Sequence, residues 1–294
     1  MIGVRRRVGR AAVATGMAVG MLGAGLAVAP AASAAAGTTL RVAITSHGLY
    51  VDGPTTFPAG RVNIFLDASG ADAGVELMRL HRGYSFKDYR GDFKIVAANL
   101  FGPGDTKTGL AALHRLINHT TALGGLYAKA GTVRHGTVLL PSAGNRYVLF
   151  DDTSAPKSAV HLTATAPAGV QTLQSTSATV VAREDRRWGG STTLPAHGNI
   201  TFANHADYSP HFVSLQHVKD GTTRQQVIDS FSSQTPPSFM LPGGQDSDIV
   251  SPGHAMVLHL QVPPGRYALM CFFPDPKTGM PHAFMGMVRM VTLT

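Results

Sequence analysis

The segment TTLPAHGNITFANH (192–205) repeats an earlier segment of the chain, TTFPAGRVNIFLDA (55–68). Both start with paired threonines and a Pro-Ala turn, and both continue into alternating apolar and polar residues, which is the pattern of a half-buried strand. Three matches in the same order predict a tandem duplication. The other two pair VELMRLHRGYS (75–85) with FVSLQHVKDGTT (212–223) and PSAGNRYVLFDD (141–152) with VPPGRYALMCFF (262–273).

The composition indicates that both copies are built from strands. The 294 residues include 33 Gly and 18 Pro, which favour many turns between short strands. We therefore expect an all-β protein of two tandem Greek-key β-sandwich domains, 37–166 and 177–294, joined by a linker over 166–176. The longer first copy predicts a helical insertion within 105–125, where four apolar residues share one helical face: Leu110, Leu113, Leu116 and Ile117.

The first 36 residues are typical of a secretory signal peptide. MIGVRRRVGR is basic, an apolar run follows, and APAASAAAG supplies small residues for cleavage near Ala34 to Ala36. The arginine cluster loosely suggests the twin-arginine route, but the usual flanking Ser and Phe are missing, which favours the general secretory route. No later segment is apolar and long enough to span a bilayer, so we expect a secreted or extracytoplasmic protein without a membrane span once the signal is removed.

The charge distribution argues against nucleic acid as a partner. The formal net charge is +8, and four of the arginines lie in the first ten residues, where no acidic residue balances them. The rest of the positive charge is spread along the chain without a basic run or interleaved aromatic residues. Proteins that bind nucleic acid usually concentrate such charge on one element or face.

Cys271 is the single cysteine of the chain and begins the stretch CFFPDPKTGMPHAFMGM (271–287). One cysteine cannot form an internal disulfide, so it serves as a buried apolar residue, a free or intermolecular thiol, or a metal ligand. The stretch offers no adjacent histidine base and no strained glycine turn, which argues against a catalytic thiol. His282 and Met287 follow on the same segment, and His211 lies on an earlier part of the same copy.

These segments resemble the cupredoxin family of type 1 blue copper proteins. ITFANHADYSPHFVSL (200–215) is similar to the cupredoxin strand that ends in Asn and leads to a Pro-His ligand. GRYALMCFFPDPKTGMPHAFMGMVRMVTL (265–293) is similar to the closing part, in which a Gly-x-Tyr strand ends in Cys and a loop follows with His and Met. The resemblance implies cupredoxin-like domains in both copies, with the first copy degenerate.

The resemblance implies a copper ligand set of His211, Cys271, His282 and Met287. Ten residues separate Cys271 from His282 and four separate His282 from Met287, so the first gap is longer than in small blue copper proteins. Two imidazoles, a thiolate and a weak thioether are the donors of an electron-transfer copper site. We therefore expect one type 1 copper in the second domain and no metal in the first, where Asp151 replaces Cys271 and Ala73 or a neighbour replaces His211.

Backbone amides near Asn204 and Phe272 are expected to donate hydrogen bonds to the cysteine sulfur. Cupredoxin-fold oxidases and nitrite reductases have a histidine directly beside this cysteine, where the present chain has Met270 and Phe272. We therefore predict an electron carrier with an extracytoplasmic redox partner protein, and not an enzyme.

Two other functions remain open on the sequence alone. Met280, Met285 and Met287 around His282 form a set of soft ligands that suits a Cu(I) carrier or buffer. A cupredoxin-fold interaction module without metal is the third possibility. In that case His211, Cys271 and His282 would not converge in the folded chain.

Overall fold

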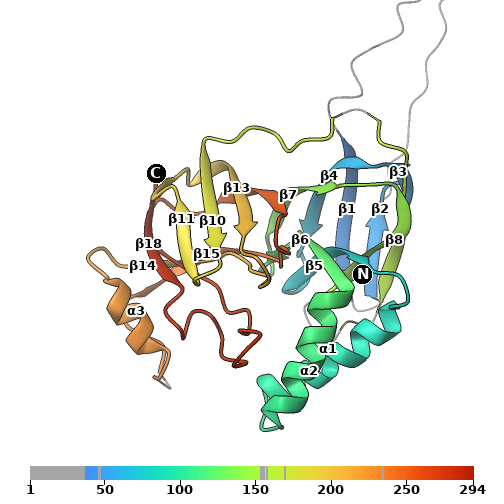
Figure 1. The fold of residues 1–294 in the computed structure, drawn as a ribbon. Coiled ribbons are helices and arrows are strands. Elements are labelled where there is room, and N and C mark those ends of the chain that lie inside the picture. The colour runs from blue at the N-terminus through green and yellow to red at the C-terminus, as the bar shows by residue number, and fades with distance from the viewer. Residues whose placement is uncertain (1–36, 46–47, 153–155, 157, 169, 234) are drawn as a thin grey trace, which may run out of the picture. The chain divides into compact units, whose positions relative to one another are not determined.

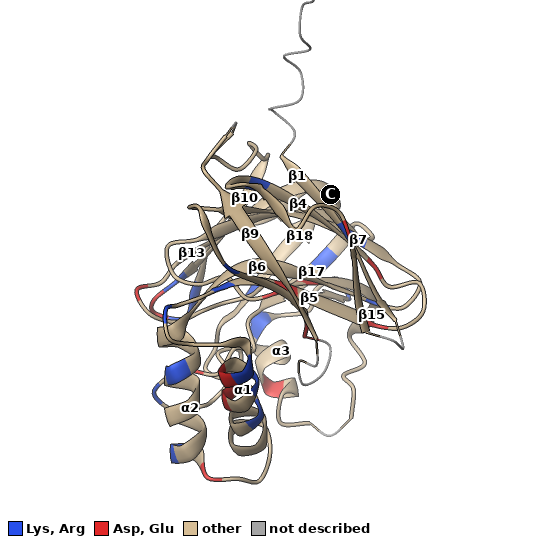
Figure 2. Ribbon diagram, turned by 90° about the vertical axis from the view of Figure 1, so that its right-hand side faces the viewer, with Lys and Arg blue, Asp and Glu red and all other residues tan. Residues whose placement is uncertain are grey.

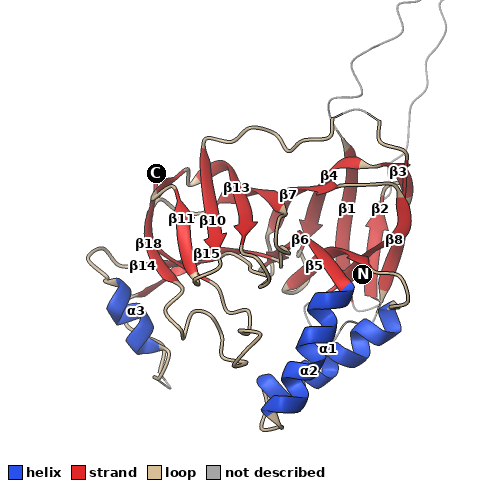
Figure 3. Ribbon diagram, in the orientation of Figure 1, coloured by secondary structure: helices blue, strands red, loops and turns tan. Residues whose placement is uncertain are grey.

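The computed structural model confirms an all-β architecture (Figure 1). The predicted signal peptide, 1–36, lies outside the described residues. The structure describes residues 37–294 except 46–47, 153–155, 157, 169 and 234. Figure 3 shows strands throughout both halves, with a few short helices at one end.

The first half of the described chain supplies nine strands. Their borders agree with the turn signals, since glycine or proline lies at or next to many of the strand ends. They are β1 (Thr38–Thr45), β2 (Gly48–Asp52), β3 (Thr56–Pro58), β4 (Gly60–Asp67), β5 (Ala73–Leu80), β6 (Thr120–Ala128), β7 (Val133–Leu140), β8 (Gly144–Asp151) and β9 (Ala159–Thr165).

The second half supplies nine strands in the same order. They are β10 (Ala178–Arg183), β11 (Arg187–Gly190), β12 (Thr193–Leu194), β13 (His197–His205), β14 (Ser214–Val218), β15 (Met240–Ser247), β16 (Ala255–Gln261), β17 (Gly265–Met270) and β18 (Val288–Leu293). Every pairing within the first half has a counterpart here, including the parallel pairs β1–β4 and β10–β13. The predicted duplication is therefore present in the topology.

The strand order of each sheet is symmetric about its centre, so that equivalent strands of the two halves lie at equal distances from the two edges. One has the order β11-β10-β13-β16-β7-β4-β1-β2, and the other has the order β12-β18-β17-β14-β15-β6-β5-β8-β9-β3. Equivalent strands meet at the centre of each sheet, where β7 pairs with β16 and β6 pairs with β15, both antiparallel. The two halves are thus related by a pseudo-two-fold axis and share continuous sheets.

A buried tyrosine fixes the same corner in each half. The Tyr147 hydroxyl donates to the Ser142 carbonyl at 2.8 Å, and the Tyr267 hydroxyl donates to the Pro263 carbonyl at 2.8 Å. These are the tyrosines of the matched segments GNRY (144–147) and GRY (265–267). The carbonyl acceptors satisfy phenol groups whose side chains are fully buried.

Alternating burial along the strands forms one core between the two sheets. In β4 the buried side chains are Val62, Ile64 and Leu66, and in β13 Ile200 and Phe202 are buried. The same connected cluster of buried side chains extends through both halves. Burial of this apolar surface is the main stabilising contribution to the fold.

The segment between the halves is fixed to the sheet, although its described residues form no strand. The Gln174 amide donates to the Thr137 hydroxyl at 3.1 Å, and the Gln171 amide donates to the Ala59 carbonyl at 3.0 Å. The predicted linker is therefore held against the first half by side-chain hydrogen bonds.

Three helices occur in the described part of the chain: α1 (Phe86–Leu100), α2 (Thr106–His119) and α3 (Arg224–Ser230). The predicted insertion at 105–125 is correct for α2, but residues 120–125 belong to β6, so the end of the prediction was wrong. Sequence reasoning missed α1, although the Ser85 hydroxyl and Asp88 form a capping box at its start. Figure 2 shows charged residues of both signs on α1 and basic residues on α2.

Within the part of the chain that the structure describes, none of the helices combines the length and the apolar character needed to cross a membrane.

Candidate metal centre

Three predicted ligands from separate parts of the second half lie close together in the fold, next to the ends of β14 and β17. Cys271 directly follows β17, His282 lies on the loop between β17 and β18, and His211 lies just before β14. The His211 backbone is fixed by two hydrogen bonds with Val250, at 3.1 and 2.8 Å. All three ligand side chains have 0% solvent exposure.

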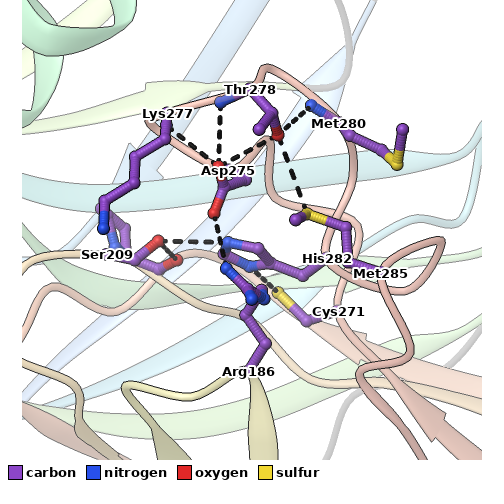
Figure 4. A network of polar contacts seen from close by, with 10 residues as sticks. Arg186, Ser209, Cys271, Asp275, Lys277, Thr278, Met280, His282 and Met285 are labelled. Carbon is purple, nitrogen blue, oxygen red and sulfur yellow. Dashed lines mark hydrogen bonds and ion pairs between the residues drawn. The ribbon is translucent and has the colours of Figure 1, made fainter.

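The distances among these side chains suit a shared ion. The Cys271 Sγ lies 3.5 Å from His211 Nδ1 and 3.7 Å from His282 Nδ1 (Figure 4). The ligand atoms of the three residues all lie within 4.8 Å of one another. An ion bonded to sulfur at about 2.3 Å and to nitrogen at about 2.0 Å, with a near-tetrahedral angle between them, places the two ligand atoms about 3.5 Å apart. Both sulfur–nitrogen distances therefore suit a transition metal held between the thiol and each imidazole.

Met287, the fourth predicted ligand, is fully buried in the core that also contains Cys271. Its backbone amide donates to the His282 carbonyl at 2.9 Å. Its own carbonyl accepts a hydrogen bond from the Trp188 indole at 3.2 Å. These bonds fix the backbone of Met287 next to the candidate centre, and its role as an axial ligand stays a prediction.

The loop from Cys271 to Met287 is organised by Asp275. Its carboxylate accepts hydrogen bonds from the Thr278 amide at 2.9 Å and the Lys277 amide at 3.0 Å, and it pairs with Arg186 at 3.2 Å (Figure 4). The Ala283 amide donates to the Cys271 carbonyl at 2.7 Å, which folds the loop back over the thiol. The long spacing between Cys271 and His282 is thus compatible with their close approach.

Asn204 holds the segment that delivers His211. Its side chain is fully buried and donates to the Ser209 carbonyl at 2.9 Å and the Val250 carbonyl at 2.8 Å. Its Oδ1 accepts a hydrogen bond from the Ala206 amide at 3.0 Å. The conformation of the turn before His211 therefore depends on one amide side chain.

The hydrogen bonds to the sulfur agree with the prediction in part. Burial raises the pKa of the Cys271 thiol to about 12, while the backbone amides of Phe212 and Phe273 act in the opposite direction by donating to the sulfur. The Phe273 donor lies next to Phe272, as expected, whereas Phe212 replaces the donor expected near Asn204, whose own amide donates to the His254 carbonyl at 2.9 Å. Two amides directed at the sulfur stabilise a thiolate, the form that binds metal.

Both histidines are held in the neutral form. Burial lowers the pKa of His211 to about 3, with a further contribution from His282, and burial lowers the pKa of His282 to about 4. His282 Nε2 lies 3.3 Å from the Ser209 hydroxyl (Figure 4). With the proton on Nε2, the Nδ1 lone pair of His282 is free to bind a metal on the side of the sulfur.

The equivalent position in the first half carries other residues. Arg79 pairs with Tyr147 in β5–β8, and His217 pairs with Tyr267 in β14–β17, so counting back along β5 and β14 matches His211 with Ala73. Counting forward from the tyrosines matches Cys271 with Asp151. Among the described residues, His211, Cys271 and His282 form the single group of three such side chains close enough to share an ion.

A group of buried carboxyls near the boundary of the halves was missed by sequence reasoning. Glu76, Asp152 and Asp248 interact with one another, and burial raises the pKa of each. Glu76 and Asp248 are within the buried core region, and each has one carboxyl oxygen without a hydrogen-bond partner. Carboxyls so far apart along the chain leave no spacing signal that could have predicted the group.

Comparison with known proteins gives partial structural similarities. No family model and no curated protein matches the chain. An auracyanin B structure shares 21% identity and covers 42% of this chain and 93% of its own, with a TM-score of 0.27. Reduced auracyanin from Roseiflexus castenholzii shares 18% identity over 40% of this chain and 94% of its own, with a TM-score of 0.25. A multicopper oxidase shares 10% identity over 87% of this chain and 88% of its own, with a TM-score of 0.23.

TM-scores this low assign no function to the chain. The structure itself shows a mostly β fold in two sheets. It also shows a buried His-Cys-His cluster that is compatible with a copper site.

Proposed function

We propose that the protein binds one copper ion of the type 1 class and transfers single electrons. The ligands are His211, Cys271 and His282, with Met287 as the weak axial donor. The observation that carries the proposal is the approach of two neutral imidazole nitrogens to one sulfur at 3.5 and 3.7 Å in a site without solvent exposure.

Bound copper supplies a one-electron couple, and the protein's contribution is to hold the donors in one arrangement. Asn204 fixes the approach to His211, and Asp275 fixes the loop that carries His282. The amides of Phe212 and Phe273 stabilise the thiolate and thereby influence the reduction potential. A dry, rigid donor set reduces the rearrangement that accompanies electron transfer.

The proposal is an electron carrier and not an enzyme. Cys271 has Met270 and Phe272 as its neighbours, so a histidine bridge to a second copper centre is missing at these positions. We further propose that the segment 1–36 directs export, that 37–166 and 177–294 are the two domains, and that the electron partner is an extracytoplasmic protein.

Titration with Cu(II), followed by visible absorption, tests the proposal. The expected result is one equivalent of copper and an intense thiolate-to-copper band, which Cys271→Ser abolishes. His197→Ala is the matched control, because His197 is an exposed histidine outside the site. A wild-type protein that binds no copper, or that binds it without this band, contradicts the proposal.

A Cu(I) carrier is a second candidate because one soft ligand on the same loop faces solvent. Met280 is 48% exposed, and Met285 lies beside it on the loop, where its sulfur contacts the Thr278 hydroxyl at 3.8 Å. A carrier should bind Cu(I) tightly without a stable blue Cu(II) form. It should also lose affinity in Met280→Leu and Met285→Leu, whereas an electron carrier should keep its copper in both variants. The convergence of the three ligands weighs against the metal-free interaction module.

A further inference from the structure

A cavity of about 340 Å³ lies between the helical hairpin of the first half and the ligand-bearing segments of the second half. Its helical wall includes Val96 of α1 and Leu113 and Ile117 of α2. The opposite wall includes Phe212 and Phe273. The insertion in the first copy therefore borders the candidate metal centre of the second copy.

The residues of the opposite wall are neighbours of the candidate ligands. Phe212 follows His211 in the chain, and Phe273 lies two positions after Cys271. The backbone amides of these two phenylalanines are the donors to the Cys271 sulfur. A molecule in the cavity therefore contacts the side chains of the two residues whose backbone amides stabilise the thiolate.

The cavity lining is apolar apart from a few groups, of which Glu76 is the most deeply buried. Glu76 is 1% exposed, and its Oε1 is buried without a hydrogen-bond partner. Buried polar atoms almost always have a hydrogen-bond partner, so a buried carboxyl oxygen without one needs an explanation. Burial raises the pKa of Glu76, and the neighbouring Asp152 raises it further, which favours a neutral carboxyl. When the proton of the neutral carboxyl is on Oε2, Oε1 is an acceptor, and a neutral ligand with one hydrogen-bond donor matches this environment.

The volume sets the size of the ligand. An apolar cavity of about 150 Å³ accommodates one benzene ring. The present cavity is about twice as large, which corresponds to two fused rings. Phe101 also lines the cavity and is 61% exposed, so the cavity meets solvent beside this residue.

We infer that this cavity binds a neutral aromatic molecule of about two fused rings whose single N–H or O–H donates to Glu76, and that its binding alters the metal centre through Phe212 and Phe273. The second part rests on the proposed copper site, whereas the first part does not. The proposal assigns the helical insertion a role in coupling ligand binding to the metal centre.

Binding is tested first on the metal-free protein, with indole and 1-methylindole as probes, by calorimetry. The two probes have nearly the same size, but only indole carries a donor. We expect indole to bind at least tenfold more tightly, since an unpaired buried acceptor disfavours the methylated probe. In Glu76→Met this preference should disappear. Equal affinities in the wild-type protein overturn the role of Glu76.

Ile117→Trp, which enlarges a half-buried side chain in the cavity wall, should weaken indole binding at least tenfold. Val96→Phe is a second filling variant, and thermal unfolding of both shows whether they fold. Nuclear Overhauser contacts from indole protons to Leu113 and Phe212 locate the probe without any variant. Binding of indole without these contacts overturns the assignment of the cavity.

The coupling is tested on the copper-loaded protein. Indole should shift the visible absorption band and the reduction potential of the wild type, and it should do neither in Ile117→Trp. If indole binds but the band and the potential stay unchanged, the coupling is wrong. If indole binds the metal-free protein as expected but no copper band forms, the proposed function fails while the cavity assignment stands.

Discussion

Tyr147 and Tyr267 occupy the same place in the two halves of the molecule, and each donates its hydroxyl at 2.8 Å to a carbonyl just upstream in its own half. Both side chains are fully buried. This relationship ties the repeat seen in the sequence to the corner of each sandwich, and in the second half the same strand ends one residue before Cys271.

Removing either hydroxyl should destabilise the whole described unit. Tyr147→Phe and Tyr267→Phe each leave a carbonyl without its donor, and we expect each to lower the free energy of unfolding by about 1 kcal/mol. Chemical denaturation measures the change. Tyr50→Phe is the control, because Tyr50 is 63% exposed, and its effect should be close to zero. Equal effects at all three positions would contradict the assigned corner hydrogen bonds.

Removing copper should lower the stability of the folded chain. A ligand that binds only the folded state adds about 2.7 kcal/mol to the free energy of unfolding when its free concentration is about 100 times Kd. We expect this increment when copper is added and its loss when a chelator is added, both followed by denaturant titration. Cys271→Ser should show no such increment, and an unchanged increment in that variant would place the bound copper elsewhere.

Asn204→Ala should weaken the site without removing a ligand. The substitution leaves the Ser209 and Val250 carbonyls without their buried donor, so we expect a loss of about 1–3 kcal/mol in unfolding free energy. Copper affinity should fall as well, because the turn before His211 is no longer fixed. Asn204→Asp keeps the acceptor for the Ala206 amide but lacks the two donors, so it should not restore copper affinity. Restoration by Asp would show that only the contact to Ala206 matters.

The buried carboxyl of Glu76 should make stability depend on pH. Its pKa is raised in the folded state by burial, and Asp152 adds to this, so the folded state binds the proton more tightly than the unfolded state. Its favourable contribution is therefore complete below the unfolded pKa of about 4.3, and it is lost as pH rises toward the folded pKa.

The loss amounts to as much as about 1.4 kcal/mol for each pH unit between the two pKa values. Denaturation of the wild type between pH 5 and pH 8 should show a decline that is smaller in Glu76→Gln. The exposed Asp229→Asn is a suitable control and should leave the slope unchanged. A decline of equal slope in Glu76→Gln would assign the pH dependence to other groups.

Local patterns in the sequence were sufficient to predict the duplication and the residues of the candidate centre. The Pro-Ala segments and the segments with a glycine shortly before a tyrosine identify equivalent strands, and Cys271, His282 and the Pro-His at His211 have recognisable neighbours. By contrast, the hydrogen bonds to the sulfur come from backbone amides, which have no residue signature. The Phe273 donor agrees with the expectation near Phe272, which came from the family resemblance, whereas the Phe212 donor was visible only in the structure.

Other features depend on contacts between distant segments. The apolar residues from Leu110 to Leu123 run through the end of α2 into β6, and periodicity alone does not separate a helix from a buried strand there. The start of α1 did have a signal, the capping pair Ser85 and Asp88. The cavity joins α1 and α2 to the second half, so no single stretch of sequence contains it.

The symmetric strand order means that, where the two halves meet in each sheet, the last strand of each half is hydrogen-bonded to a strand of the other half. If the chain were cut between 166 and 177 and the pieces separated, β6 and β7 in one piece and β15 and β16 in the other would each expose unpaired backbone groups. Exposed edge strands of this kind pair with strands of other molecules and promote aggregation. The copy without the candidate ligands thus shields the copy that has them, and the ligand-bearing copy alone would form an aggregation-prone fragment.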